Sequence, residues 1–149
     1  MASEWVGARG RMTVTAGYSG TPLGKKLGVK DGQRTWRWKM PASVAEEIAR
    51  DGLEPRQVKT PVAGLEMAHV FETKKAEMGK HLKQLRSVLA QDGTIWVSWP
   101  KKAAKIETDI TEDSVREVAL PLGFVDIKVC AVDEVWSGLK LVIRKSERK

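Results

Sequence analysis

Lysine residues recur where apolar runs of this sequence end. Lys74 follows the run 65–71, and Lys101 and Lys102 follow the run 94–99, which ends on a tryptophan. Lysine ammonium groups bind phosphate and carboxylate groups as compact charges, and indole rings offer flat surfaces for stacking. These residue types predict a site for an anionic ligand or an anionic protein partner. The candidate ligand-binding residues are Ser19, Thr21, Lys39, Ser43, Thr73, Lys74, Ser98, Trp99, Lys101, Lys102, Asp133, Glu134 and Trp136.

Two interpretations of these residues stay open. In the functional one, lysines and helix N-termini hold a phosphate or carboxylate group, with Trp99 or Trp136 as a stacking surface. In the structural one, Lys101 or Lys102 pairs with a carboxylate of the segment 133–134, and the tryptophans fill the core. Trp99 and Trp96 lie an odd number of residues apart, so we expect them on opposite faces of one strand.

The segment Ser19-Gly20-Thr21 also has two interpretations. Its backbone N–H groups precede a predicted helix and could cradle an oxyanion, because the helix dipole favours negative charge there. Alternatively, Thr21 is the N-cap of that helix and Pro22 takes the first helical position. The glycine spacing around this segment does not match a phosphate-binding loop.

Few other residues could carry chemistry. His69 lies in an apolar run and is predicted to be a hydrogen-bonded core histidine, whereas His81 is predicted to be solvated on a lysine-rich helix. Cys130, the single cysteine, is predicted to be a small buried hydrophobic residue. No serine has the sequence context of a nucleophile elbow, and the two histidines are too far apart to predict a metal site.

Hydrophobic periodicity predicts the elements that position these residues. Met78, Leu82, Leu85 and Leu89 share one stripe of a helix, after which Asp92-Gly93 is predicted to be a turn. The predicted strands are 34–39, 57–60, 65–71, 94–99, 125–132 and 139–144, and the predicted helices are 22–27, 41–51, 74–89 and 111–120.

The order of these elements predicts an α/β fold with a mostly parallel, Rossmann-like sheet, helices on both faces and a C-terminal antiparallel strand pair. A strand, helix, strand unit is almost always a right-handed crossover, so 65–71 and 94–99 should be parallel neighbours. Ligands of such sheets bind outside the carboxyl ends of the strands, and most of the candidate residues fall at that edge.

The length of 149 residues predicts one domain, 18–149, after a flexible arm of residues 1–17. One cysteine and the absence of a long apolar run or secretory signal predict a cytoplasmic protein without membrane contact. The net charge of +7 favours anionic partners, so nucleic-acid binding is kept as an alternative. The first half of the chain is short for this fold, so a second copy could complete the sheet. We therefore expect a monomer or a homodimer.

Two stretches resemble the class I methyltransferase fold: 85–97, which is similar to its helix, turn and fifth strand, and Gly123-Phe124 before the closing strand pair. The motifs YSGTPL (18–23), WVSWPKK (96–102), TED (111–113) and WSGLKLVIRK (136–145) resemble an uncharacterised bacterial domain-of-unknown-function family. This resemblance implies a methyltransferase-like fold and no assigned activity.

The sequence departs from cofactor-binding members of the fold in the loop after the first strand. Those proteins carry closely spaced glycines there and an acidic residue after the second strand. Here the loop has no glycine, Pro41 removes one N–H donor, and Thr60-Pro61-Val62 contains no carboxylate. We therefore expect no cofactor, and we predict a non-catalytic or atypical domain that binds an anionic group. A methyltransferase with a divergent S-adenosylmethionine pocket is the alternative.

Overall fold

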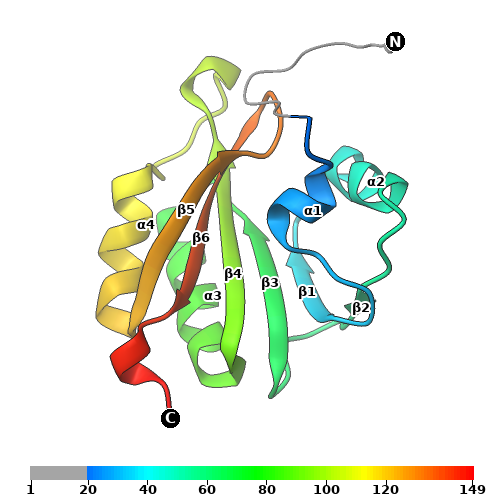
Figure 1. Ribbon diagram of the computed structural model, residues 1–149. Helices are drawn as coiled ribbons and strands as arrows, with labels where there is room; N and C mark the ends of the chain where they lie inside the picture. Colours follow the sequence, from blue (N-terminus) through cyan, green and yellow to red (C-terminus); the bar gives the residue numbers. More distant parts are fainter. Residues whose placement is uncertain (1–19) are drawn as a thin grey trace.

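The computed structural model describes residues 20–149, which form a six-stranded sheet with helices on both faces (Figure 1). The predicted α/β class is therefore confirmed. The predicted arm of residues 1–17 and the candidate Ser19 lie outside the described residues.

The elements alternate along most of the chain. The strands are β1 (Arg34–Trp38), β2 (Arg56–Gln57), β3 (Leu65–Phe71), β4 (Leu89–Pro100), β5 (Phe124–Ala131) and β6 (Trp136–Ile143). The α-helices within residues 20–149 are α1 (Leu23–Leu27), α2 (Ala42–Arg50), α3 (Lys75–Val88) and α4 (Glu112–Ala119). Short 3-10 helices cover Lys102–Ala104, Leu120–Leu122 and Lys145–Glu147.

The strand order is β2-β1-β3-β4-β6-β5. Strands β2, β1, β3 and β4 are parallel to their neighbours, with Val70 of β3 opposite Trp38 of β1 and Val97 of β4. Strand β6 runs antiparallel to both β4 and β5. Both the parallel β3–α3–β4 crossover and the C-terminal antiparallel pair are thus as predicted.

Strands β3 and β4 contribute residues to two cores, because successive side chains of a strand point to opposite faces. The larger core packs strand residues such as Val70, Val97 and Trp99 against α3 and α4. The smaller core packs Met67 and Trp96 with residues of α1 and α2. Trp96 and Trp99 therefore lie on opposite faces, as their spacing predicts.

Trp96 anchors α1 to the sheet. Its side chain is fully buried, and its indole Nε1–H donates a hydrogen bond of 2.7 Å to the carbonyl oxygen of Leu27, the last residue of α1. Gly28 follows with a φ of 83°, which ends the helix in the left-handed conformation that glycine adopts readily. This confirms the predicted stop at Gly28.

Three local predictions are wrong. The strand predicted over 57–60 is β2 at Arg56–Gln57, so three of its four predicted residues lie outside the strand. Thr21 is not the N-cap of α1, because Pro22 occupies that position and no side chain caps the helix. Asp92-Gly93 is not a simple turn, because Leu89 leaves α3 directly into β4. There the pairing with β3 skips from Leu89 to Thr94, so the Asp-Gly pair bulges inside a strand that tertiary pairing extends.

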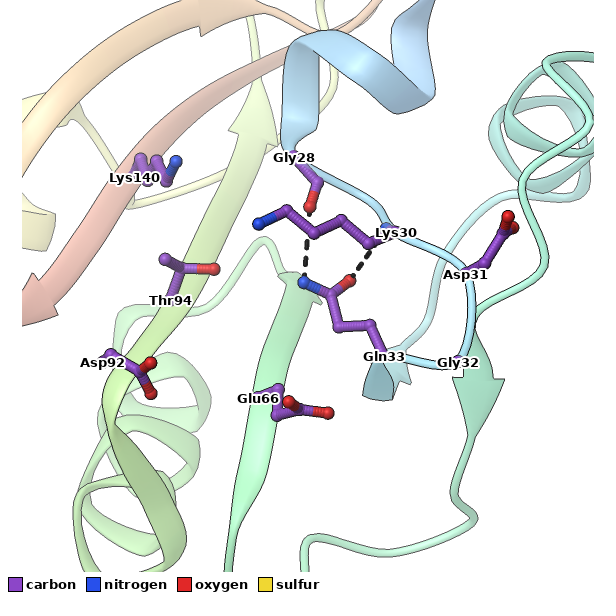
Figure 2. A pocket seen from close by; sticks show the side chains of 9 residues that line it. All are labelled: Gly28, Lys30, Asp31, Gly32, Gln33, Glu66, Asp92, Thr94 and Lys140. Atoms are coloured by element: carbon purple, nitrogen blue, oxygen red, sulfur yellow. Dashed lines mark hydrogen bonds between the residues drawn. The ribbon is translucent and has the colours of Figure 1, made fainter.

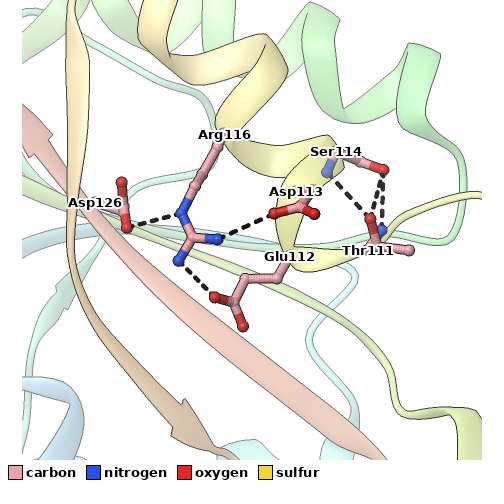
Figure 3. Close-up of polar contacts among 6 residues, drawn as sticks. All are labelled: Thr111, Glu112, Asp113, Ser114, Arg116 and Asp126. Atoms are coloured by element: carbon pink, nitrogen blue, oxygen red, sulfur yellow. Dashed lines mark hydrogen bonds and ion pairs between the residues drawn. The ribbon is translucent and has the colours of Figure 1, made fainter.

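Helix α4 is fixed at both its start and its flank (Figure 3). Thr111 and Ser114 form a reciprocal capping box at its N-terminus. Arg116 donates hydrogen bonds to Glu112, Asp113 and Asp126, the last of which belongs to β5. Asp126 and Glu112 raise the pKa of Arg116, and the bond to Asp126 ties α4 to β5.

Candidate functional site

The carboxyl edge, where β1, β3 and β4 end, is framed by the loop 101–111. Thr108 of this loop donates a 2.7 Å hydrogen bond from its hydroxyl to the carbonyl oxygen of Thr73, and Asp109 accepts the backbone N–H of Lys75 at 2.7 Å. The loop is therefore tied to the start of α3. The Asp109 carboxylate already occupies the anion-favouring end of that helix.

Two adjoining hollows lie beside this loop, and we call them the rim pocket. Thr73 and Lys74 line the first, Trp99, Lys101 and Lys102 line the second, and both share Glu107 and Thr108. Five of the predicted site residues are therefore brought together. Among residues 20–149 no ion pair joins Lys101 or Lys102 to Asp133 or Glu134, so the predicted structural pairing is absent there.

The connector between β5 and β6 adjoins the rim pocket, because the Val135 carbonyl oxygen accepts the backbone N–H of Lys101 at 2.8 Å, but its predicted site residues point elsewhere. Asp133 accepts the backbone N–H groups of Val135 and Trp136, both at 2.8 Å, and so shapes its own turn. The Trp136 ring meets Phe71 edge-on at 5.1 Å between ring centroids and packs on the smaller core. Glu134 is exposed. Neither carboxylate nor the indole lines either hollow of the rim pocket.

Ser98 is not a rim residue, contrary to prediction. Its side chain is fully buried, and its hydroxyl lies 2.8 Å from His69 Nε2. His69 is 1% exposed, and its Nδ1 atom has no hydrogen-bond partner among the described residues. Burial, with a smaller contribution from the charge of Arg37, lowers the pKa of His69 to about 3. This confirms the predicted hydrogen-bonded core histidine.

The end of β1 carries a buried acidic contact that the sequence interpretation missed. Glu72, only 3% exposed, accepts a 2.9 Å hydrogen bond from Trp38 Nε1, and its carboxylate lies 3.7 Å from Lys39 Nζ. These contacts lower the pKa of Glu72 despite the opposing effect of burial. A carboxylate directly after the apolar run 65–71 was the available signal.

His81 is packed rather than solvated, contrary to prediction. Its ring centroid lies 4.4 Å from that of Trp38 and 5.5 Å from that of Trp36. Its Nε2 atom is buried and has no hydrogen-bond partner among the described residues, and burial lowers the pKa of His81. The signal was its position three residues after Met78, on the apolar stripe of α3. Cys130 is only partly buried beside the smaller core.

The loop between β1 and α2 makes a tight turn of the kind that glycine usually permits. Lys39 adopts a φ of 55°, a left-handed conformation that costs free energy for a residue with a side chain. Helix α2 has no side-chain cap, and the N–H groups of Ala42 and Ser43 donate to no described residue. The missing glycines therefore do not remove the turn, and two N–H donors remain for an anionic group.

These residues fit one end of S-adenosylmethionine. The N–H groups of Ala42 and Ser43 suit a carboxylate, since the N-terminus of α2 favours negative charge. By contrast, β2 is followed by Val58, Lys59 and Thr60, which supply no carboxylate for ribose hydroxyls. A pocket for this cofactor would therefore be divergent at its ribose end.

No group of three or more histidine, cysteine, aspartate and glutamate side chains is placed to hold a metal ion within residues 20–149. None of the helices described here combines the length and apolar character that crossing a bilayer requires.

Comparison with known proteins gives structural similarity alone. No protein-family model matches the chain, and no curated protein matches its sequence. The domain-of-unknown-function resemblance thus stays a prediction.

Several solved structures share the fold at low sequence identity. An S-adenosylmethionine-dependent methyltransferase from Aquifex aeolicus has a TM-score of 0.55 and 18% identity, covering 80% of this chain and 86% of that one. A chain from the "complex between the Haloferax volcanii Trm112 methyltransferase activator and the putative methyltransferase" has a TM-score of 0.59 and 10% identity, covering 85% of this chain and 89% of that one.

LepI in complex with S-adenosylmethionine has a TM-score of 0.52 and 11% identity over 83% of this chain. The match spans about half, 47%, of the LepI chain. All three sequence identities are too low to transfer a function to this chain, but the three structures share its architecture. The described part of this chain therefore has the Rossmann-like fold of class I methyltransferases.

Proposed function

We propose that this protein is a methyltransferase that binds S-adenosylmethionine in a divergent pocket at the carboxyl edge. The observation that carries the proposal is the β1–α2 loop, where Lys39 keeps a left-handed turn and α2 is left uncapped. A strained backbone conformation is retained only where surrounding contacts support it. Here Glu72 supports it by pairing with Lys39 and hydrogen-bonding Trp38.

In this proposal the chain contributes binding and orientation. The N–H groups of Ala42 and Ser43 hold the carboxylate of the cofactor. Glu72 fixes the β1–α2 loop through its contacts with Trp38 and Lys39. When bound, S-adenosylmethionine would supply an electrophilic methyl group. The rim pocket, which lies beside the ends of β3 and β4, would receive the methyl acceptor. Its lysines favour an anionic part of that acceptor, whereas Glu107, Asp109 and Glu112, which also line it, favour a cationic part.

The binding test compares ligands and one loop variant. S-adenosylmethionine and S-adenosylhomocysteine should raise the melting temperature, whereas adenosine monophosphate at equal concentration should not. A ligand at one hundred times its Kd stabilises the folded state by about 2.7 kcal/mol, which gives a clear shift. No stabilisation by either compound at millimolar concentration would refute the proposal.

Ala42→Pro removes one proposed donor without breaking α2. Proline is tolerated at the first helical position, and Pro41 has a ψ of 145°, which is compatible with a following proline. We expect weaker cofactor binding with an unchanged unfolding free energy. Ala42→Gly retains the N–H group and is the matched control, so equal binding by both variants would contradict the assigned role.

A second candidate function is a non-catalytic domain that binds an anionic molecule in the rim pocket. The observation that favours it is the gathering of Lys74, Lys101 and Lys102 beside Trp99, combined with the absence of a carboxylate after β2. Lys101→Glu/Lys102→Glu should then lose retention on heparin, and unchanged retention would exclude this candidate. A steep fall of binding to generic DNA or RNA with salt would instead indicate a nucleic-acid partner.

A further inference from the structure

A separate pocket lies at the opposite edge of the sheet, where β1, β3 and β4 begin (Figure 2). The segment 28–33 forms one wall, and Thr94 of β4 and Lys140 of β6 form the other. None of these residues lines the rim pocket or the β1–α2 loop. The pocket therefore needs an explanation of its own.

Lys140 lies close to other positive charges. It pairs in register with Lys128 on β5, and like charges directly opposite each other on neighbouring strands are destabilising. Its Nζ is 6.0 Å from the centroid of the Trp96 ring, a cation–π contact that attracts the charge and places its stem over the smaller core. Burial, together with the charges of Lys128 and Lys30, lowers the pKa of Lys140.

Lys30 adds a second positive charge to the same space. Figure 2 shows its side chain extending from the 28–33 segment toward the gap between Lys140 and Thr94. Gln33 holds this segment, because its side chain donates to the Gly28 carbonyl oxygen and accepts the Lys30 backbone N–H, both at 3.3 Å. The backbone that carries Lys30 is therefore fixed beside the pocket.

No carboxylate of residues 20–149 lies within 4.0 Å of the Nζ atoms of Lys30, Lys128 or Lys140. The acidic side chains of Asp31, Glu66 and Asp92 also line the pocket. In Figure 2, Glu66 and Asp92 lie below the lysines, and Asp31 lies on the far side of the 28–33 segment. Glu66 is engaged by the backbone N–H of Arg34 at 2.8 Å. The pocket thus has a cationic end and an acidic end.

This charge distribution indicates the class of ligand. A phosphomonoester carries a charge of about −1.5 to −2 at pH 7, which two lysines balance. A long polyanion would also meet the acidic end, where it would be repelled. A small molecule with one phosphate group and a hydroxylated or amine-bearing remainder satisfies both ends.

We propose that this pocket binds the phosphate group of a small phosphorylated molecule between Lys30 Nζ and Lys140 Nζ, with the Thr94 hydroxyl as a further donor. The bound phosphate offsets the repulsion among the three lysines. The site is separate from the proposed methyltransferase site, so each can be tested without the other.

The test uses glycerol 3-phosphate as the probe, at an ionic strength held constant with sodium chloride. Binding is followed by thermal shift and by the 31P line width of the probe. We expect stabilisation of the wild-type protein and an affinity at least roughly tenfold lower in Lys30→Met/Lys140→Met, since two charge-assisted contacts are lost. Lys59→Met/Lys83→Met removes the same charge from exposed positions outside this pocket and should bind as the wild type does.

Three results would overturn the proposal. They are an absence of wild-type stabilisation beyond the sodium chloride control, an equal response in the two double variants, and equal stabilisation by glycerate, which has a carboxylate and no phosphate. The Lys30→Met/Lys140→Met protein should fold, because the substitutions relieve repulsion, and its stability without the probe is measured by urea unfolding. Ala42→Pro should respond to the probe as the wild type does, which separates this site from the carboxyl edge.

Discussion

His69 should make the protein less stable as the pH falls from 8 to 5. The unfolded chain protonates His69 with an ordinary pKa of about 6.5, whereas the folded protein keeps it neutral until the pH approaches about 3. The unfolded state therefore binds more protons throughout this window. Because protonation is linked to unfolding, the free energy of unfolding keeps its full value above pH 6.5 and decreases progressively below it.

The magnitude follows from the gap between the two pKa values. Each pH unit below the unfolded pKa costs about 1.36 kcal/mol, so the free energy of unfolding should fall by about 2 kcal/mol between pH 8 and pH 5. The pKa shift of His69 needs no reduction for solvent screening, because the side chain is 1% exposed and, among residues 20–149, is hydrogen-bonded only to Ser98. For a domain of this size that is a large fraction of the total stability.

The assay is urea unfolding followed by tryptophan fluorescence at pH 8, 7, 6 and 5 in buffers of equal ionic strength. His69→Gln removes the titrating group, and we expect the fall in its unfolding free energy over this range to be smaller by about 2 kcal/mol, with the part due to His81, whose pKa burial also lowers, remaining. Contributions from carboxyl groups such as Glu47, whose pKa burial raises, cancel in the comparison of the two proteins. His81→Gln is the control for the second histidine of the chain. A slope that His69→Gln leaves unchanged would refute the assignment of a neutral buried imidazole.

Other predictions concern packing and charge. Trp96→Phe removes the Nε1–H donor of the buried Leu27 carbonyl and should cost about 1–3 kcal/mol in urea unfolding; a cost below a few tenths would contradict the anchoring role. Gly138→Ala should destabilise by about 1–3 kcal/mol, because an added Cβ would lie 3.1 Å from Val132 Cγ2 and 3.2 Å from Trp96 Cε3. Gly79→Ala in α3 meets only an ordinary 3.6 Å contact and should stabilise by about 0.5–1 kcal/mol, so equal signs for the two glycine variants would be inconsistent with this packing. Lys140→Met should raise the unfolding free energy at low salt and reduce its increase with pH near the lysine pKa, because folding lowers the pKa of Lys140; urea unfolding at low and high sodium chloride measures both effects.

Local sequence patterns were sufficient for most elements of the fold. The spacing of Met78, Leu82 and Leu85 predicts α3, and the apolar runs predict β3 and the central part of β4. These predictions hold because helix and strand periodicities are properties of neighbouring residues. The same argument predicts that Trp96 and Trp99 face opposite sides.

The candidate site depended on contacts between distant segments. Ser98 lies near the end of β4, yet the pairing of β3 with β4 turns its hydroxyl toward His69 in the core. Asp92-Gly93 has the composition of a turn, and the pairing of Leu89 with Leu65 keeps it within β4. A one-dimensional pattern contains neither contact.

The sequence by itself determined the α/β class, the parallel crossover and the closing antiparallel pair, since local periodicity and chain order are enough for these. Only the tertiary structure decided that Glu72 supports the Lys39 turn, that His81 packs on Trp38, and that Lys30 approaches Lys140 across 110 positions of the sequence. The physical reason is that charge and hydrogen-bond energies depend on distances in space, and these are fixed when the sheet assembles.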